Sequence, residues 1–270
     1  MCRNRLACFL GAALGVLALS GGVVHGEILA SADFSTYADG ALVGQNGWQR
    51  YSSQTSSPLT VSGGAVSWAG GSTTNNEDAF LAFAQQIGQP TTGSLVLNFD
   101  LVLSVTAASS TNPSYFAALN TLTTSATGGN FQNARLVTQA SGAGFVFGAR
   151  VNGQGGYPFA FGTNVLNLNQ DYALRAEINM VAGNANDFIN LYVGPDFDNL
   201  TLHATASYST GTVNDPLFGA MLISQFGSAT SSEPGVSIRS MRLTAVPEPT
   251  SAGVLALVSV VGIAIRRRRK

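Results

Sequence analysis

The stretch LVLNFDLVLSV, residues 95–105, decides the fold class because its side chains alternate in character. Every odd position is apolar, whereas the even positions include Asn98 and Asp100. A period of two is that of an extended strand with one face in an apolar core and the other nearer water. We therefore expect Leu101 to be buried. Asp100 should lie on the more polar face and tolerate lysine, unless it pairs with a cation or a metal.

The same alternation recurs from about residue 28 to residue 243, in segments joined by turns rich in Gly, Ser, Asn and Thr. Residues 172–180 repeat it closely, and no segment has the pattern of an amphipathic helix. Roughly a dozen strands predict an all-β fold, an antiparallel β-sandwich, for which a jelly roll is the natural closed arrangement. An eight-stranded barrel and a β-helix are the alternatives, although no fixed-period repeat supports a β-helix.

The first 26 residues have the organisation of a signal peptide. Arg3 and Arg5 precede an apolar run over residues 6–19, which is short for a membrane span. Cleavage is expected after Gly26, and residues 20–22 offer a second position. The alternative is a retained N-terminal anchor.

The last 25 residues, 246–270, form a second segment that does not belong to the folded domain. Two prolines, Pro247 and Pro249, flank Glu248 and cannot continue a strand ladder, so the domain is expected to span residues 27–245. An apolar run over residues 252–265 follows, and as a helix it would span about 21 Å, less than a bilayer core of about 30 Å. The chain closes with five cations: Arg266, Arg267, Arg268, Arg269 and Lys270.

This ordered tail of Pro-Glu-Pro, a short apolar helix and an arginine cluster resembles the PEP-CTERM sorting signal of Gram-negative bacteria. The resemblance implies transient membrane anchoring and recognition by an exosortase, a transpeptidase-like membrane enzyme that removes the tail. It also implies export to the cell surface or extracellular matrix, often alongside exopolysaccharide. The alternative is an ordinary tail anchor that is never processed.

Composition excludes several classes of function for the mature chain. Both cysteines, Cys2 and Cys8, lie in the signal peptide, which excludes a disulfide framework, thiolate metal sites and a catalytic cysteine. Residues 27–246 carry six arginines and no lysine against 13 acidic residues, a net charge of −7. Because nucleic-acid binding needs cations along the phosphate track, this balance argues against a nucleic-acid partner.

Residues 33–48, with Asp33-Phe34 and the run LVGQNGW, resemble the opening of many secreted concanavalin A-like (laminin-G-like) domains. Residues 187–195 similarly resemble a late strand of that family, and residues 238–243 its closing strand. The resemblance implies the sandwich fold and brings no catalytic residue to this sequence.

Catalytic chemistry finds little support in the sequence. His203 is the only histidine after the signal peptide, and we interpret it as a strand surface residue. Glu77 and Asp78 are adjacent and Glu177 stands alone, so none forms the spaced carboxylate pair of a glycosidase. We interpret all three acids as solvated surface residues and predict that the protein is not an enzyme.

A Ca²⁺ site is the one metal site that the sequence suggests; no other cofactor is expected. Asp196, Asp198 and Asn199 follow a Gly-Pro turn and place three oxygen-bearing side chains close together, and Asn186 and Asp187 are candidates to add more. The alternative is a polar turn, because Asp and Asn also favour turns.

Glycan binding would use aromatic and amide side chains near loops. The aromatic candidates are Trp48, Tyr51, Trp68 and Tyr157, and the amide candidates are Gln45, Asn46, Asn152 and Gln154, with Trp48 better explained as core. The leading hypothesis is an exported, non-enzymatic surface or matrix protein that contacts exopolysaccharide. The alternatives are a jelly-roll glycan hydrolase and a purely structural coat protein.

Overall fold

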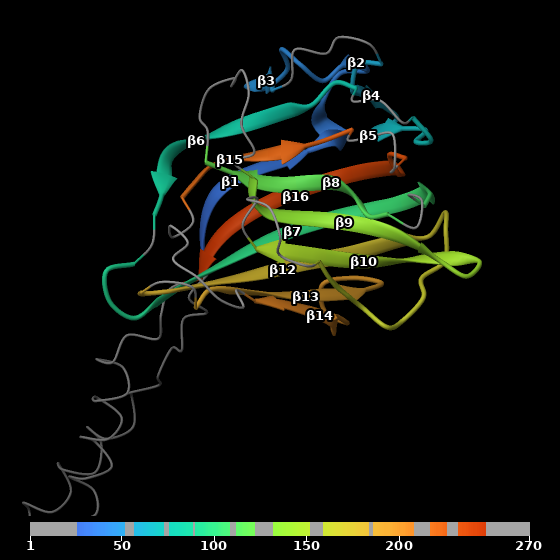
Figure 1. Cartoon of the computed structure of the whole chain (residues 1–270). Helices are drawn as coiled ribbons and strands as arrows, with labels where there is room; N and C mark the ends of the chain where they lie inside the picture. Colours follow the sequence, from blue (N-terminus) through green and yellow to red (C-terminus); the bar gives the residue numbers. More distant parts are fainter. Residues whose placement is uncertain are drawn as a thin grey trace, which may run out of the picture.

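A computed structural model describes residues 26–51, 57–72, 76–88, 90–108, 112–121, 132–151, 159–183, 186–207, 217–225 and 232–246. Two antiparallel sheets pack face to face across one apolar core (Figure 1). The predicted all-β, antiparallel jelly-roll sandwich is thereby confirmed. The predicted signal peptide, up to residue 25, and the predicted sorting segment from Pro247 to Lys270, with its arginine cluster, lie outside the described residues. Among the residues that are described, no helix is long and apolar enough to cross a membrane.

Within the described residues, the first sheet contains nine strands. In spatial order they are β14 (Thr201–Ser207), β13 (Phe188–Gly194), β12 (Asp171–Val181), β7 (Ser94–Ala107), β16 (Gly235–Val246), β5 (Ala65–Trp68), β4 (Thr60–Ser62) and β2 (Gly40–Ala41), with β1 (Glu27–Asp33) also paired to β16. The long strands β7, β12 and β16 form its centre.

The second sheet has seven strands in the same described ranges. Their order is β11 (Ala160–Phe161), β10 (Gly144–Val151), β9 (Gln132–Ser141), β8 (Ser114–Asn120), β15 (Phe218–Ile223), β6 (Ala79–Ile87) and β3 (Trp48–Arg50). A single turn of 3₁₀ helix, η1 (Phe34–Thr36), follows β1. Because β6, β7 and β8 alternate between the two sheets, the chain crosses the core repeatedly, and the ends of the sandwich bring distant segments together.

Strand β7 has the predicted register. Its odd residues from Leu97 to Val105 are almost wholly buried in the core. Asp100 departs from the prediction, because it is only 3% exposed and does not face water. Arg175 on β12 and Arg242 on β16 stand directly opposite it and hold both of its carboxylate oxygens.

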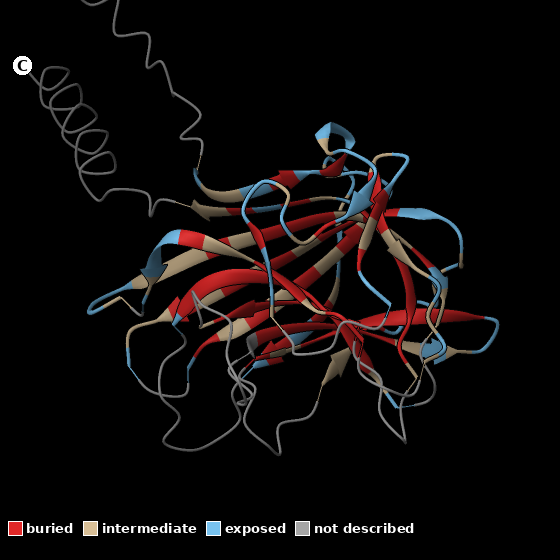
Figure 2. Cartoon of the chain, turned by 90° about the horizontal axis from the view of Figure 1, so that it is seen from above, coloured by how far each residue is buried: buried red, intermediate tan, exposed pale blue. Residues whose placement is uncertain are grey.

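The core lies between the facing sides of the two sheets, and Figure 2 shows buried residues following the strands while exposed ones gather at the turns. Trp48 is 1% exposed, which confirms its interpretation as a core residue. Its indole Nε1 donates to the Tyr37 hydroxyl over 3.3 Å, and its ring packs against Phe34. Trp48 therefore joins the start of β3 to η1 and to the residue that follows it, within the core.

Candidate functional site

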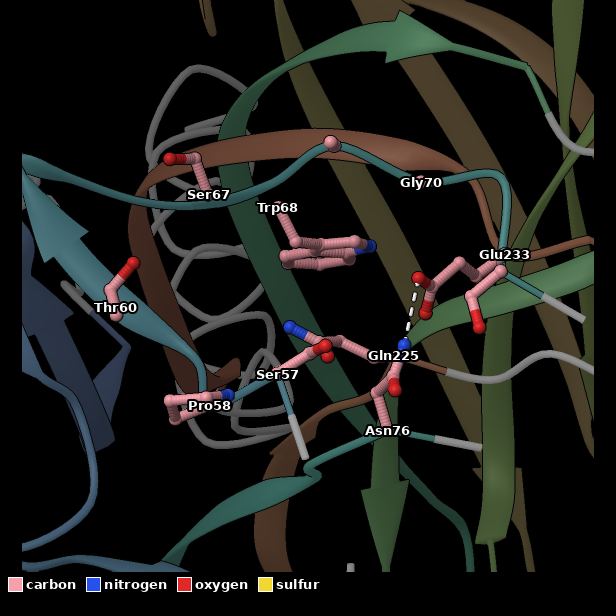
Figure 3. Close-up of a pocket in the computed structure, with 11 residues that line it drawn as sticks. Ser57, Pro58, Thr60, Ser67, Trp68, Gly70, Asn76, Gln225 and Glu233 are labelled. Carbon is pink, nitrogen blue, oxygen red and sulfur yellow. Dashed lines mark hydrogen bonds between the residues drawn. The ribbon is translucent and has the colours of Figure 1, made fainter. Parts of the chain in front are cut away.

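Of the aromatic residues that the sequence suggested for glycan binding, Trp68 lies at a cavity. The last residue of β5, it stays partly exposed at one end of the sandwich. The cavity has a volume of about 420 Å³, and we call it the Trp68 pocket. Its lining includes Trp68, Ser57, Pro58, Asn76, Gln225 and Glu233 (Figure 3). Tyr157, Asn152 and Gln154 lie outside the described residues.

One wall of the pocket is a close crossing of two backbone segments. Gly70 has φ of +75°, and a Cβ at this position would overlap the backbone nitrogen of Gly235. Two hydrogen bonds also join these segments. The Gly71 N–H donates to the Glu233 carbonyl, and the Glu233 N–H donates to the Ser72 carbonyl, each over 2.9 Å. The crossing fixes the backbone of Glu233 relative to that of Trp68.

Buried polar side chains form another part of the pocket lining. Asn76, Gln225 and Glu233 are all at most 5% exposed. The side-chain amide of Asn76 donates to Glu233 Oε1 over 2.9 Å, a contact drawn as a dashed line in Figure 3. The backbone N–H of Asn76 donates to the Gln225 carbonyl over 3.2 Å. Residues that are far apart in the sequence therefore share one wall.

Three polar atoms at the pocket are buried and have no hydrogen-bond partner in the described structure: Trp68 Nε1, Gln225 Oε1 and Glu233 Oε2. A buried donor or acceptor without a partner costs about 1–3 kcal/mol, and native proteins satisfy most such groups with a protein group, a water or a ligand. The pocket lining thus contains one donor and two acceptors without partners, all three buried, beside the indole ring of Trp68.

Glu77 and Asp78 adjoin the pocket wall, and the interpretation of Glu77 as a solvated surface residue was wrong, whereas Asp78 is half-buried. Glu77 is 1% exposed, and its two carboxylate oxygens accept from Arg50 Nε and the Leu59 N–H, each over 2.9 Å. Glu77 and Asp78 immediately precede β6, and Glu77 joins that point of the chain to Arg50 of β3 and to Leu59. Sequence alternation cannot show these contacts, because their partners are distant in the sequence and come together only in the tertiary fold.

Burial also changes the acidity of the neighbouring carboxyls. Burial raises the pKa of Asp78 from 3.8 to about 6, although Ser224 Oγ and the Gln225 N–H donate to the Asp78 carboxylate. The charges of Glu233 and Glu77 raise the Asp78 pKa further. Burial raises the Glu233 pKa as well. This end of the sandwich therefore carries a negative potential that Arg50 offsets at Glu77.

The outer face of the seven-stranded sheet carries a second cluster of polar and aromatic groups. Arg135 on β9 and Arg150 on β10 are cross-strand partners. The Arg135 guanidinium lies over the Tyr115 ring at 5.0 Å, and that of Arg150 over the Phe159 ring at 5.3 Å. Tyr51, another predicted aromatic candidate, packs on the same face against Phe80. Burial lowers the pKa of both arginines.

The residues predicted to bind calcium form a compact turn. Asp196 Oδ1 accepts from the backbone N–H groups of Asp198 and Asn199, and the Asn199 side-chain amide donates to both Asp196 oxygens. Asp187 is used elsewhere, accepting from the Val181 N–H over 2.7 Å. No group of three or more His, Cys, Asp or Glu side chains suited to a metal occurs in the described ranges. The calcium site stays a prediction.

The remaining chemical candidates lie apart from the pocket. Glu177 is half-buried on β12 and accepts from the side-chain amides of Asn179 and Asn190. His203 on β14 packs close to Gly162, and burial lowers its pKa. Among the described residues lining the pocket, Glu233 supplies the one carboxylate.

No protein-family model matches the chain, and no curated protein matches it. Several solved structures are similar to it. One is the CBM2 module of the Lactobacillus casei BL23 phage J-1 evolved Dit, at 13% identity and a TM-score of 0.46, covering 81% of this chain and 95% of that one. Another is the Ca²⁺-bound exoplasmic/lumenal domain of VIP36, at 12% identity and a TM-score of 0.43, covering 74% of this chain and 83% of that one. A third is a mutant of the alginate lyase Aly36B in complex with alginate tetrasaccharide, at 13% identity and a TM-score of 0.45, covering 79% of this chain and 95% of that one. These values are too low to bear on what this chain binds.

Proposed function

We propose that this chain is an exported, non-enzymatic protein of the cell surface or extracellular matrix that binds a saccharide in the Trp68 pocket. The observation that carries the proposal is the combination of the Trp68 indole with three buried polar atoms that lack partners, on Trp68, Gln225 and Glu233. The sequence had predicted contact with exopolysaccharide, and the Trp68 pocket is the proposed place of that contact.

Sugars match this combination because a pyranose ring has an apolar C–H face and a rim of hydroxyl groups. The indole provides a flat apolar surface for the C–H face of the sugar. Hydroxyl groups both donate and accept hydrogen bonds, so the rim of the sugar can pair with a protein donor as well as with protein acceptors. A volume of about 420 Å³ lies within the usual range for small-molecule sites, which is about 300–1,000 Å³. One or two sugar units are therefore the expected occupants.

The composition of the pocket favours binding over hydrolysis. Glycosidases act with two carboxyl groups on either side of the scissile bond, about 5–10 Å apart. Glu233 is the one acid on the pocket lining within the described residues, and Asp78 is held by Ser224 and Gln225 behind that wall. The alternative of a glycan hydrolase would need a second acid at the sugar.

Export and sorting rest on the two ends of the chain. Residues 1–26 have the order of a signal peptide, and residues 246–270 have the order of a PEP-CTERM signal. The proposed processing partner is an exosortase-type membrane enzyme, which would release the domain after transient anchoring. Intact-mass measurement of the extracellular protein should give a carboxy terminus between Pro247 and Ser251. Released protein that retains Arg266 to Arg269 would contradict this route.

A glycan array tests saccharide binding directly. The protein should bind a defined subset of glycans, and Trp68→Ala should abolish that binding because it removes the stacking surface. Tyr192→Ala is the matched control, since Tyr192 is a partly exposed aromatic residue on β13 of the same sheet and does not line the pocket. If no glycan binds, or if both variants behave alike, the coat-protein alternative gains support.

A further inference from the structure

We infer that the Trp68 pocket selects a sugar with a free, protonated amino group, that is, an unacetylated amino sugar. The inference rests on the proposed function and specifies the class of ligand. It follows from the balance of donors, acceptors and charge at the pocket.

The two acceptor oxygens without partners favour a ligand rich in hydrogen-bond donors. Gln225 Oε1 and Glu233 Oε2 are acceptors, and each is buried without a partner in the described structure. An ammonium group has three N–H donors and no acceptor, whereas a hydroxyl has one donor. An ammonium that reached both oxygens would supply each with a donor, and a neighbouring hydroxyl would accept from Trp68 Nε1.

The fixed geometry of Glu233 adds directionality. Its Oε1 is already engaged by the Asn76 amide, and its backbone is tied on both sides to residues 71 and 72. The backbone N–H of Ser72 also donates to the carboxylate, and Oε2 is the oxygen that is buried without a partner in the described structure. Hydrogen bonds between an ammonium and a carboxylate are shorter and stronger than those between neutral groups. The preformed geometry lowers the entropic cost of making that contact.

The charge around the pocket also favours a cation. Arg50 pairs with Glu77, while Asp78 lies close enough to Glu233 for the two charges to interact unfavourably. A ligand cation would relieve that repulsion. The Trp68 ring contributes in the same direction, because the face of an indole attracts a cation within about 6 Å. A neutral N-acetyl group would lose both contributions.

The test compares three monosaccharides on the full-length protein at pH 7 by ligand-observed NMR titration. D-glucosamine should bind about tenfold more tightly than D-glucose or N-acetyl-D-glucosamine, the ratio that 1.4 kcal/mol produces. Glu233→Gln should remove this preference, since it keeps the shape and removes the charge. Glu177→Gln, a neutralised acid on β12 away from the pocket, should retain the preference.

The outcomes separate the inference from the proposed function. Equal affinities for glucose and glucosamine in the wild-type protein would overturn the amino-sugar inference and leave saccharide binding intact. Binding of none of the three, with the array also negative, would overturn the proposed function itself. Thermal melting shows whether Glu233→Gln folds, and if it does not, the comparison of the three sugars on the wild-type protein decides alone.

Discussion

The side-chain amide of Asn76 donates a 2.9 Å hydrogen bond to Glu233 Oε1, and the two residues are 157 positions apart in the chain. Both are buried, so the bond joins the segment before β6 to the segment before β16 in the interior. It thereby aligns one wall of the Trp68 pocket. Its removal should affect both stability and the pocket.

Replacing Asn76 tests this bond. Asn76→Ala leaves the Glu233 carboxylate without its amide donor, and we expect a loss of about 1–3 kcal/mol in the free energy of unfolding. Asn76→Asp places a second carboxylate against the first and should be more destabilising at pH 7 than at pH 5, where protonation relieves the repulsion. Urea unfolding at the two pH values measures both effects. A loss for Asn76→Asp that does not depend on pH would contradict the assigned contact.

The raised pKa of Asp78 predicts a pH dependence of stability. Because the folded-state pKa of about 6 exceeds the ordinary 3.8, folding favours the protonated acid. Its contribution is complete below pH 3.8 and is lost as the pH rises through 6. A shift of this size corresponds to about 3 kcal/mol as an order of magnitude. Glu233, whose pKa burial also raises, acts in the same direction.

Asp78→Asn isolates that contribution, because the amide oxygen can still accept from Ser224 and Gln225 while the charge is absent. The variant and the wild type should unfold alike near pH 4, and the variant should be more stable at pH 7. Chemical denaturation across this range measures the difference. A variant that is less stable than the wild type at pH 7 would show that the ionised carboxylate stabilises the fold.

The ion pairs of Asp100 lead to a different prediction from that of the sequence. Asp100 is bound by Arg175 at 2.7 Å and by Arg242 at 2.9 Å. Asp100→Lys would place three cations together and should cost about 3–5 kcal/mol, as breaking a buried ion pair does. Leu101→Asp should also cost several kcal/mol, because it leaves an unpaired charge in the core. Thermal melting of the two variants should show comparable losses, and a neutral Asp100→Lys would contradict the ion-pair geometry.

The backbone crossing at Gly70 can be tested against a matched neighbour. Gly70→Ala combines a positive φ with an overlap at Gly235, and we expect a loss on the order of 2–4 kcal/mol. Gly71→Ala has a similar φ of +86°, but its Cβ would meet no atom within 4 Å. It should cost only about 1 kcal/mol of backbone strain. Equal losses would mean that the crossing does not constrain the pocket wall.

The fold was predictable because strand alternation is local. The apolar residues at odd positions of β7 from Leu97 to Val105 share one face of the strand, and that face is buried in the core. The environment of Asp100 was not predictable, since Arg175 and Arg242 are its neighbours only through strand pairing. The sequence suggested an aromatic role for Trp68, but it gave no signal that Asn76, Gln225 and Glu233 would join it. Those three residues come from loops that meet at one end of the sandwich.

The most direct measurement of the central claim uses the indole N–H resonances of the protein. The chain has two tryptophans: the Trp48 Nε1 donates to Tyr37, whereas the Trp68 Nε1 at the pocket is buried without a hydrogen-bond partner in the described structure. In a ¹⁵N-labelled sample titrated with D-glucosamine, the Trp68 Nε1–H resonance should shift with saturation while that of Trp48 stays in place. If neither resonance moves, or if both move equally, the Trp68 pocket is not a saccharide site.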